Sequence, residues 1–196
     1  MKTPKIICLT GGIGSGKTTI SNYFATFGVP IYIADDEAKK LTNNPQIITR
    51  IQEVFGSEIF VNHILDRKKL ATIVFEDKSK LEQLNKIIHP AVQKHFEIWL
   101  QKYSESKFII KESAILFESG AYKKCDITIT VVVSMEERIK RIIIRDKCTR
   151  EEVLKRIQNQ WTDEQKIEKS DYVIQNSNLE IAKSQANNIL KILSNY

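Results

Sequence analysis

The sequence has few of the features that mark membrane, secreted or metal-cluster proteins. Its 196 residues contain no apolar run near the roughly 18 to 20 residues needed to cross a bilayer, so we expect no membrane partner. The start, Met1–Lys5, leads straight into an apolar run and does not read as a signal peptide. The three cysteines, Cys8, Cys125 and Cys148, lack metal-ligand spacing, and an odd number suits a reducing compartment. We therefore expect a cytoplasmic protein.

Missing motifs also argue against two classes of binding protein. A regulatory GTP-binding switch usually carries Asp-x-x-Gly and Asn-Lys-x-Asp, but no glycine here has Asp three places before it, and Asn85–Ile88 lacks the aspartate. The net charge of +6 would suit nucleic acid, yet Lys and Arg alternate with Glu along the chain, and no base-stacking or helix-turn-helix motif is present. A small polyanionic substrate explains the charge equally well. We expect no nucleic-acid partner, and a monomer or a small homo-oligomer.

What the sequence does contain is a phosphate-binding loop motif. Gly11–Thr19 reads GGIGSGKTT directly after the apolar run Ile6–Leu9 and matches G-x-x-x-x-G-K-[ST]. Glycines let backbone N–H groups approach phosphate oxygens, and the following helix directs its positive end at the same anion. The strand–loop–helix context favours this interpretation over a purely structural glycine turn. The expected nucleotide-binding residues are Gly12, Ile13, Gly14, Ser15, Gly16, Lys17, Thr18 and Thr19.

Within this loop, two side chains carry specific chemistry. Lys17 is expected to place its charge near the β- and γ-phosphates, and the Thr18 hydroxyl to serve as a magnesium ligand.

The apolar pattern predicts an α/β fold around the loop. Helices are expected over 17–27 and over a closing segment from Leu179 to Leu193, and others begin at the capping-box patterns of Ser134 and Thr149. A βαβ unit of this size implies a parallel sheet with a right-handed crossover. The expected strands are 6–10, 30–33, 108–110, 127–133 and 172–174.

Between the second and third strands, residues 36–103 are expected to form a mainly helical insertion beside the strand ends where α/β proteins bind ligands. Pro90 predicts a helix boundary at His89. His63 and His95 have no partner at metal-ligand spacing. The insertion is therefore interpreted as core-packed helices rather than a metal site.

Two acidic residues end predicted strands at the edge of the sheet where the loop must lie. Asp35 is placed to accept a proton from a hydroxyl that attacks the γ-phosphate. Its alternative is a helix cap, a role that we assign to Asp36. Glu112 is placed to reach magnesium directly or through water, or else to form a local cap or pair.

Three arginines, Arg138, Arg141 and Arg145, share one face of the predicted helix after Ser134. Guanidinium groups on a helical lid would neutralise charge on a transferring phosphoryl group and exclude water. The alternative is a solvated face paired with neighbouring acidic residues. We favour the lid, because the phosphate loop creates a need for such charge.

Taken together, these motifs resemble the dephospho-coenzyme A kinase family over nearly the whole chain. The order of the motifs is more specific than the phosphate loop, which occurs in many kinases. The matching segments are 9–19, 28–30, 34–35, 65–67, 89–90, 116–120, Arg141, 145–146, Gln160 and 171–174.

The resemblance implies a three-layer, P-loop nucleoside-triphosphate hydrolase-like α/β fold with a mostly parallel sheet. Its core would comprise 1–35, 104–137 and 166–196, with a helical coenzyme-A-binding insertion at 36–103 and a lid at 138–165. It further implies that ATP, with Mg²⁺, phosphorylates the ribose 3′-hydroxyl of dephospho-coenzyme A. The catalytic residues carried over by motif are Lys17, Asp35, Arg141 and Arg145. Another small-metabolite kinase would share this core but use a different acceptor.

The sequence departs from the family pattern at three places. Ile33 replaces an aspartate two places before the base, and Ala114–Leu116 replaces Pro-Leu-Leu. Asp163 stands where the family commonly has an arginine three residues after Gln160. We therefore do not count Asp163 among the expected adenine or phosphate contacts of the lid.

Overall fold

The computed structural model describes residues 3–62 and 64–195, so His63 lies outside the described residues. The chain divides into two compact units. The first comprises Met1–Ile33 and Leu100–Tyr196, and the second comprises Ala34–Trp99. No described helix is both long and apolar enough to cross a membrane.

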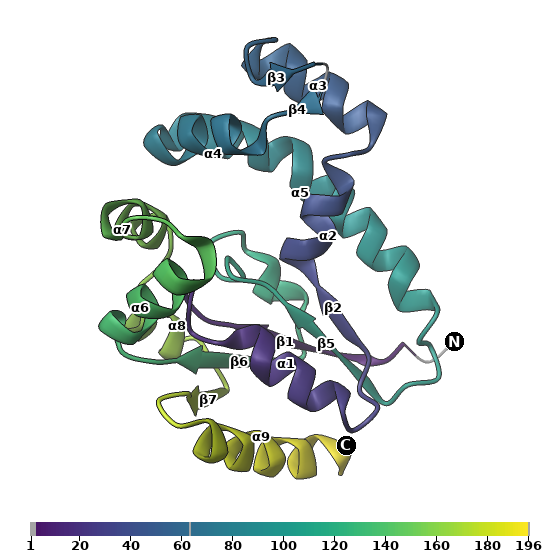
Figure 1. Ribbon diagram of the computed structural model, residues 1–196. Helices are drawn as coiled ribbons and strands as arrows, with labels where there is room; N and C mark the ends of the chain where they lie inside the picture. The colour runs from purple at the N-terminus through teal and green to yellow at the C-terminus, as the bar shows by residue number, and fades with distance from the viewer. Residues whose placement is uncertain (1–2, 63, 196) are drawn as a thin grey trace. The chain divides into compact units, whose positions relative to one another are not determined.

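The first unit is built on a five-stranded sheet in the order β2-β5-β1-β6-β7 (Figure 1). All four pairings are parallel, so the carboxyl ends of the strands share one edge. The chain moves from β1 to one side for β2 and to the other for β6, and ligands of α/β proteins bind at such a switch point. The strands are β1 (Lys5–Thr10), β2 (Ile31–Ile33), β5 (Phe108–Glu112), β6 (Ile127–Val132) and β7 (Tyr172–Gln175).

These five strands confirm the sequence prediction, with bounds that differ by one or two residues. The β-branched residues of β6 are mostly buried, as expected for a strand that is covered on both faces.

Alternate residues of β1 separate the two faces of the sheet. Ile7 and Leu9 pack with α1 (Lys17–Ala25) and α9 (Leu179–Ser194), whereas Cys8 packs with Leu116 and Phe117. This follows from the two-residue period of a strand. The sheet is therefore the middle of three layers. The remaining helices of this unit are α6 (Met135–Asp146), α7 (Arg150–Gln158) and α8 (Asp163–Ile167), with a short 3₁₀ helix, η1 (Ala121–Lys124).

The second unit is mainly helical, as predicted for this part of the chain, and encloses its own apolar core. Ile51, Phe55, Leu70, Val74 and Ile87 are among its buried residues. A two-stranded antiparallel pairing of β3 with β4 was not predicted from the sequence. The elements are α2 (Ala34–Leu41), α3 (Pro45–Phe55), β3 (Phe60–Val61), β4 (Ile64–Leu65), α4 (Arg67–Glu76) and α5 (Lys78–Gln101).

Two predicted helix boundaries in this unit are wrong. Helix α5 continues through Pro90, although proline removes a helical hydrogen bond at a cost of about 3 kcal/mol. Burial of Ile87, Ile88 and Phe96 on the same helix offsets that cost. Asp36 is not a cap, because β2 runs directly into α2 and leaves Asp36 inside its first turn.

A third correction concerns the capping boxes. Thr149 and Glu152 form the complete reciprocal box that was predicted. Ser134 caps α6 by accepting from the Glu137 N–H, but the Glu137 carboxylate accepts from Arg141 Nε at 2.9 Å. The motif after β6 is therefore a simple cap, because the acidic side chain is engaged one turn further along.

Two of the cysteines are joined in a way that their number did not indicate. Cys8 and Cys125 form a disulfide across 117 residues, and Cys148 is free. Cys125 follows η1 and precedes β6, the neighbour of β1, and Asp126 N–H donates to Ile6 O at 2.9 Å. The segment that leads into β6 therefore lies beside β1, the strand that carries Cys8.

Candidate active site

The loop between β1 and α1 has the backbone form that a phosphate site requires. Gly14 and Gly16 have φ angles of +82° and +91°, in the left-handed region that glycine adopts without strain. Gly16 is also the N-cap of α1 and provides no side-chain cap for its first N–H groups. The positive end of α1 therefore opens onto the loop.

Lys17 and Thr18 are the first residues of α1, and their side chains contact two different segments, the phosphate loop and the end of β5. Thr18 is exposed, whereas Glu112 is buried. Lys17 is buried, and its Nζ donates to Gly12 O at 3.3 Å. Thr18 Oγ1 donates to Glu112 Oε1 at 2.8 Å, and Ser21 Oγ donates to Glu112 Oε2 at 2.7 Å. The structure thus brings together three predicted site residues and adds Ser21, which the motif did not include.

The Thr18–Glu112 pair has the donor chemistry of a magnesium site. Mg²⁺ prefers oxygen ligands and is usually held by one or two protein groups together with substrate phosphates. The hydroxyl of Thr18 in the first turn of α1 and the carboxylate of Glu112 at the end of β5 meet that description. Among residues 3–62 and 64–195, no group of three or more His, Cys, Asp and Glu forms a self-sufficient metal site. The residues present therefore fit a magnesium ion that is brought with a nucleotide.

Arg141 reaches the loop from α6. Its Nη1 donates to Ser15 O at 3.5 Å and its Nη2 to Asn176 O at 3.1 Å. Asn176 Nδ2 also donates to Ser15 O, at 2.8 Å. Asn176 was missed by sequence reasoning; the available signal was a polar residue two places after the predicted strand 172–174, directly after β7 as observed.

Arg145, the other predicted lid residue, lies further out. Its side chain is 61% exposed and forms two hydrogen bonds with the Asp146 carboxylate, at 2.7 and 3.0 Å. This hydrogen bond from Arg145 is the main reason that the pKa of the Asp146 carboxyl lies below its usual range. The role of Arg145 toward a nucleotide stays a prediction.

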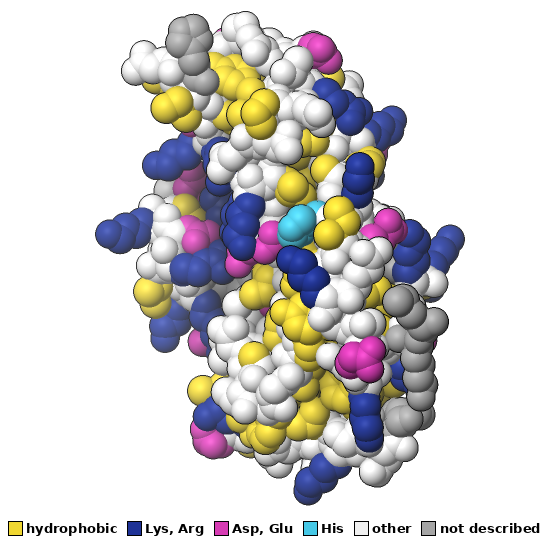
Figure 2. Space-filling view, turned by 90° about the vertical axis from the view of Figure 1, so that its right-hand side faces the viewer, with side chains coloured by type: hydrophobic (Ala, Val, Ile, Leu, Met, Phe, Trp, Pro, Cys, Tyr) yellow, Lys and Arg dark blue, Asp and Glu magenta, His cyan; other side chains and the backbone are white. Residues whose placement is uncertain are grey.

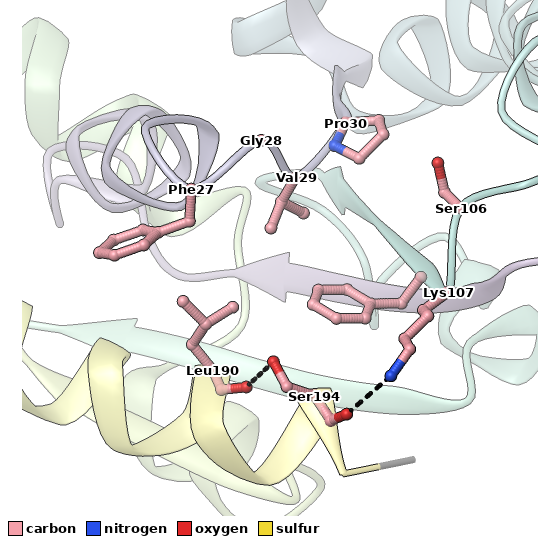
Figure 3. A pocket seen from close by; sticks show the side chains of 9 residues that line it. Phe27, Gly28, Val29, Pro30, Ser106, Lys107, Leu190 and Ser194 are labelled. Carbon is pink, nitrogen blue, oxygen red and sulfur yellow. Dashed lines mark hydrogen bonds between the residues drawn. The ribbon is translucent and has the colours of Figure 1, made fainter.

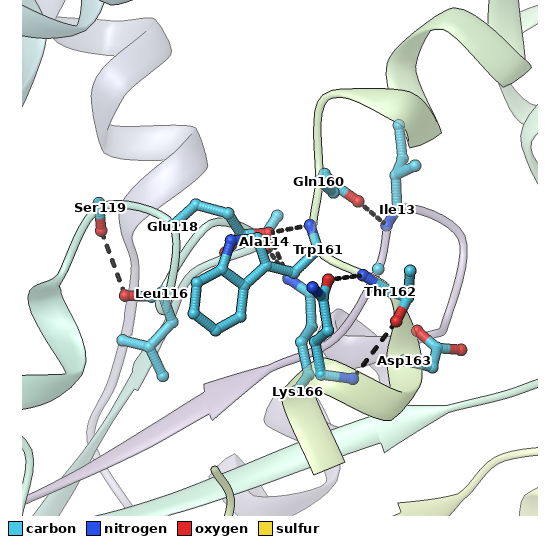
Figure 4. A network of polar contacts seen from close by, with 12 residues as sticks. Ile13, Ala114, Leu116, Glu118, Ser119, Gln160, Trp161, Thr162, Asp163 and Lys166 are labelled. Carbon is cyan, nitrogen blue, oxygen red and sulfur yellow. Dashed lines mark hydrogen bonds and ion pairs between the residues drawn. The ribbon is translucent and has the colours of Figure 1, made fainter. Parts of the chain in front are cut away.

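A second set of polar contacts links the segment after β5 with the segment before α8 (Figure 4). Gln160 Oε1 accepts from Ile13 N–H at 2.8 Å. Glu118 Oε1 accepts from Trp161 N–H and from Lys166 Nζ, both at 2.8 Å. Lys166 is buried and its Nζ also donates to Ala114 O at 2.8 Å. Burial lowers the pKa of Lys166, and the Glu118 carboxylate opposes that effect.

Asp35 belongs to the second unit, in the first turn of α2. The strand before it, β2, ends at Ile33, which pairs with Glu112. Within the second unit, burial lowers the pKa of His89, and the negative charge of Asp35 partly restores it. The charge of Asp35 therefore acts on His89, although neither residue type nor spacing indicated this.

A pocket of about 410 Å³ lies away from this chemistry (Figure 3). Pro30 and Lys107 line it, and they precede β2 and β5, whereas the phosphate loop follows the carboxyl end of β1. The pocket is thus at the opposite edge of the sheet. On the face drawn in Figure 2, Lys and Arg side chains are interspersed with Asp and Glu.

Comparison with known proteins decides the family. The family model for dephospho-CoA kinase matches residues 5–181. The chain belongs to the dephospho-CoA kinase family. Its activity is accordingly the kinase reaction of this family, ATP-dependent phosphorylation of dephospho-CoA in coenzyme A biosynthesis.

Relatives of this family cover most of the chain. A dephospho-CoA kinase from Fusobacterium nucleatum is 46% identical over 177 residues, which are 89% of this chain and 91% of that protein. Among solved structures, a protein from Thermus thermophilus has a TM-score of 0.87 at 31% identity, and covers 97% of this chain and 98% of its own. A dephospho-CoA kinase from Campylobacter jejuni has a TM-score of 0.69 at 28% identity, and covers 97% of each chain.

The three departures from the family motifs occupy defined places. Ile33 ends β2, paired with Glu112. Ala114 provides the carbonyl that Lys166 binds, a backbone contact that does not depend on its side chain. Asp163 forms an ion pair with Arg138 at 3.1 Å, so an acidic side chain at position 163 has a cationic partner within the same unit.

Proposed function

We propose that this site transfers the γ-phosphoryl group of ATP to the ribose 3′-hydroxyl of dephospho-coenzyme A, giving coenzyme A and ADP. The observation that supports it best is the polar cluster at the start of α1, in which the buried Lys17 lies against the phosphate loop and Thr18 is bonded to the buried Glu112. That cluster is polarised toward an anion: loop N–H groups, the α1 terminus and the Lys17 ammonium all act on the same region.

The nucleotide is proposed to bind through the residues from Gly12 to Thr19. The Lys17 ammonium would stabilise charge on the β- and γ-phosphates as the bond to the leaving oxygen breaks. Arg141 is already directed at the loop through Ser15 O. We assign it to the phosphates, together with Arg145, whose exposed side chain must leave Asp146 to reach them.

Asp35 is proposed as the general base that accepts the proton of the attacking hydroxyl. It follows β2 by two residues, and in a parallel sheet the carboxyl ends of β2, β5 and β1 lie at one edge. Thr18 and Glu112 would hold Mg²⁺. The ion would supply charge neutralisation on the phosphate oxygens.

The second unit is proposed to receive the acceptor, with the domain bounds expected from the family: a core of 1–35, 104–137 and 166–196, an acceptor insertion of 36–103 and a lid of 138–165. The proposed location is the cytoplasm, with the protein acting as a monomer or small homo-oligomer, without nucleic acid or membrane. The Cys8–Cys125 disulfide argues against this location, because disulfides are uncommon in reducing compartments such as the cytoplasm.

A direct assay tests the proposal. The protein is supplied with ATP, Mg²⁺ and dephospho-coenzyme A, with adenosine and shikimate as control acceptors, and ADP release is coupled to NADH oxidation while coenzyme A is identified by mass. We expect turnover with dephospho-coenzyme A alone. Lys17→Ala should nearly abolish it, whereas Lys124→Ala, at an exposed lysine of η1, should not. Turnover retained by Lys17→Ala, or preference for a control acceptor, would refute the assignment.

A further inference from the structure

Arg138 is the arginine of α6 to which the reaction above gives no role, yet it is more buried than Arg141 and Arg145. Its side chain is only 3% exposed. Nε donates to Ile13 O at 3.0 Å, and Nη1 donates to Asp163 Oδ1 at 3.1 Å. The guanidinium therefore connects the phosphate loop to the first residue of α8.

The contact with Ile13 O determines where a loop N–H points. In a trans peptide the C=O of one residue and the N–H of the next point in opposite directions, and the described part of the chain has no cis peptide. Because Arg138 binds Ile13 O from outside the loop, the N–H of Gly14 must face the other way, into the loop. Asn176 binds Ser15 O and directs the N–H of Gly16 inward in the same manner.

The peptide between Gly12 and Ile13 has the opposite orientation, with its C=O directed into the loop and its N–H directed outward. Gly12 O accepts from Lys17 Nζ and from Ser15 N–H, while Ile13 N–H is turned outward to Gln160 Oε1. Arg138 and Gln160 thus bind the two backbone polar groups of Ile13. Both the N–H and the C=O of Ile13 are therefore held by side chains that lie outside the loop.

The atoms around Gly12 show how closely the Arg138 guanidinium packs against the phosphate loop. Gly12 is not among the glycines with positive φ, so its backbone suits any residue. A Cβ at this position would nevertheless overlap Cζ and Nη2 of Arg138. A side chain at position 12 would therefore displace the end of the Arg138 side chain, whereas φ at this position does not call for glycine.

A buried guanidinium needs a counter-ion, and Asp163 provides one. Burial raises the pKa of the Asp163 carboxyl, and the charge of Arg138 opposes that rise. Among the described residues, Arg138 Nη2 has no hydrogen-bond partner although it is buried. Buried pairs with an unsatisfied donor are poor sources of stability, which favours a role in the site over a role in folding.

We propose that Arg138 is a positioning residue for nucleotide binding: it fixes the peptide between Ile13 and Gly14 so that the Gly14 N–H faces the phosphates, and Asp163 keeps its guanidinium in place. This proposal rests on the proposed function only in that the loop binds ATP; it does not depend on the identity of the acceptor.

The experiment measures Mg·ATP binding by calorimetry without any acceptor, for the full chain and its variants. Arg138→Gln should weaken ATP binding by roughly ten- to a hundredfold, the range expected for loss of a hydrogen bond from a charged group. Asp163→Asn, which keeps the guanidinium but removes its counter-ion, should weaken binding by less. Arg150→Gln is the matched control, because its pair with Glu136 is exposed on both sides, and it should leave the affinity unchanged.

Thermal unfolding of the same variants separates positioning from packing. The proposal is overturned if Arg138→Gln lowers the melting temperature but binds ATP within about twofold of the wild type. Should Arg138→Gln not fold, Asp163→Asn carries the test, and unchanged affinity in that variant overturns the proposal equally. A wild-type chain that binds ATP but does not phosphorylate dephospho-coenzyme A would refute the proposed function and leave this test intact.

Discussion

Replacing Gly12 by alanine tests how closely the Arg138 guanidinium packs against the phosphate loop, because the change is made in the loop and not in the arginine. The added methyl group would overlap Cζ and Nη2 of Arg138, and the guanidinium must then move. The backbone itself gives no penalty. Where the φ of a glycine suits other residues, replacing it by alanine usually raises the free energy of unfolding by about 0.4–1 kcal/mol. Any loss of stability therefore reports the displaced arginine.

The size of that loss follows from the contacts of Arg138. Moving the guanidinium breaks the bond to Ile13 O and the pair with Asp163. Loss of a charged hydrogen bond costs about 1.5–3 kcal/mol, and breaking a buried pair costs about 3–5 kcal/mol. Since Asp163 is 18% exposed and regains some water, we expect a net loss of about 3 kcal/mol, or roughly 6–12 °C in melting temperature.

The assay is a double-mutant cycle followed by urea and thermal unfolding. In an Arg138→Ala background the methyl group meets no guanidinium, so Gly12→Ala should show only the backbone gain of about 0.4–1 kcal/mol. The coupling free energy should therefore be about 3–4 kcal/mol. Gly28→Ala is the control, because Gly28 has φ +78° with open space around it. Its cost should be the same in both backgrounds. An equal loss for Gly12→Ala in both backgrounds would refute the reasoning.

Three further predictions concern the chemistry and the charges. Asp35→Asn should lower kcat by roughly 10² to 10⁴, the usual contribution of a general base, without weakening ATP binding; unchanged kcat would move the base elsewhere. Glu112→Gln should raise the Mg²⁺ concentration needed for half-maximal rate more than it raises the KM for ATP, and equal effects on both would argue against a metal role. The hydrogen bond from Arg145 holds the pKa of the Asp146 carboxyl below its usual range. The carboxylate therefore stabilises the fold above the unfolded-state pKa, and this effect is lost as pH falls through the folded-state pKa. The melting temperatures of wild type and Asp146→Asn should therefore differ at neutral pH and converge in acid; a difference that persists below both pKa values would contradict this.

The elements that the sequence predicted are those specified by neighbouring residues. The phosphate loop is one contiguous motif, and the five strands are short apolar runs bounded by polar residues. Capping at Thr149 likewise depends on a residue three places away. The boundary at Pro90 failed because packing along a 24-residue helix outweighed the local preference of proline.

The features that escaped prediction depend on register between distant segments. Arg138 meets Ile13 across 125 residues, and Asn176 meets Ser15 across 161. On the helix alone, Arg138, Arg141 and Arg145 are equivalent members of one face, and only the packing of α6 on the loop makes the first buried and the last exposed. Asp163 shows the same limit of sequence-based prediction. It departs from the family motif, and its partner Arg138 lies 25 residues earlier in the chain.

The anchoring of Ser15 O by Asn176 has an entropic consequence. Fixing the backbone of one residue costs about 1–2 kcal/mol at 25 °C, and this cost arises wherever ordering takes place. Here the loop carbonyls are bound by side chains of the folded protein, so the ordering is completed during folding. A nucleotide that enters the loop gains its hydrogen bonds without losing backbone entropy there, and its dissociation leaves the loop ready for the next turnover.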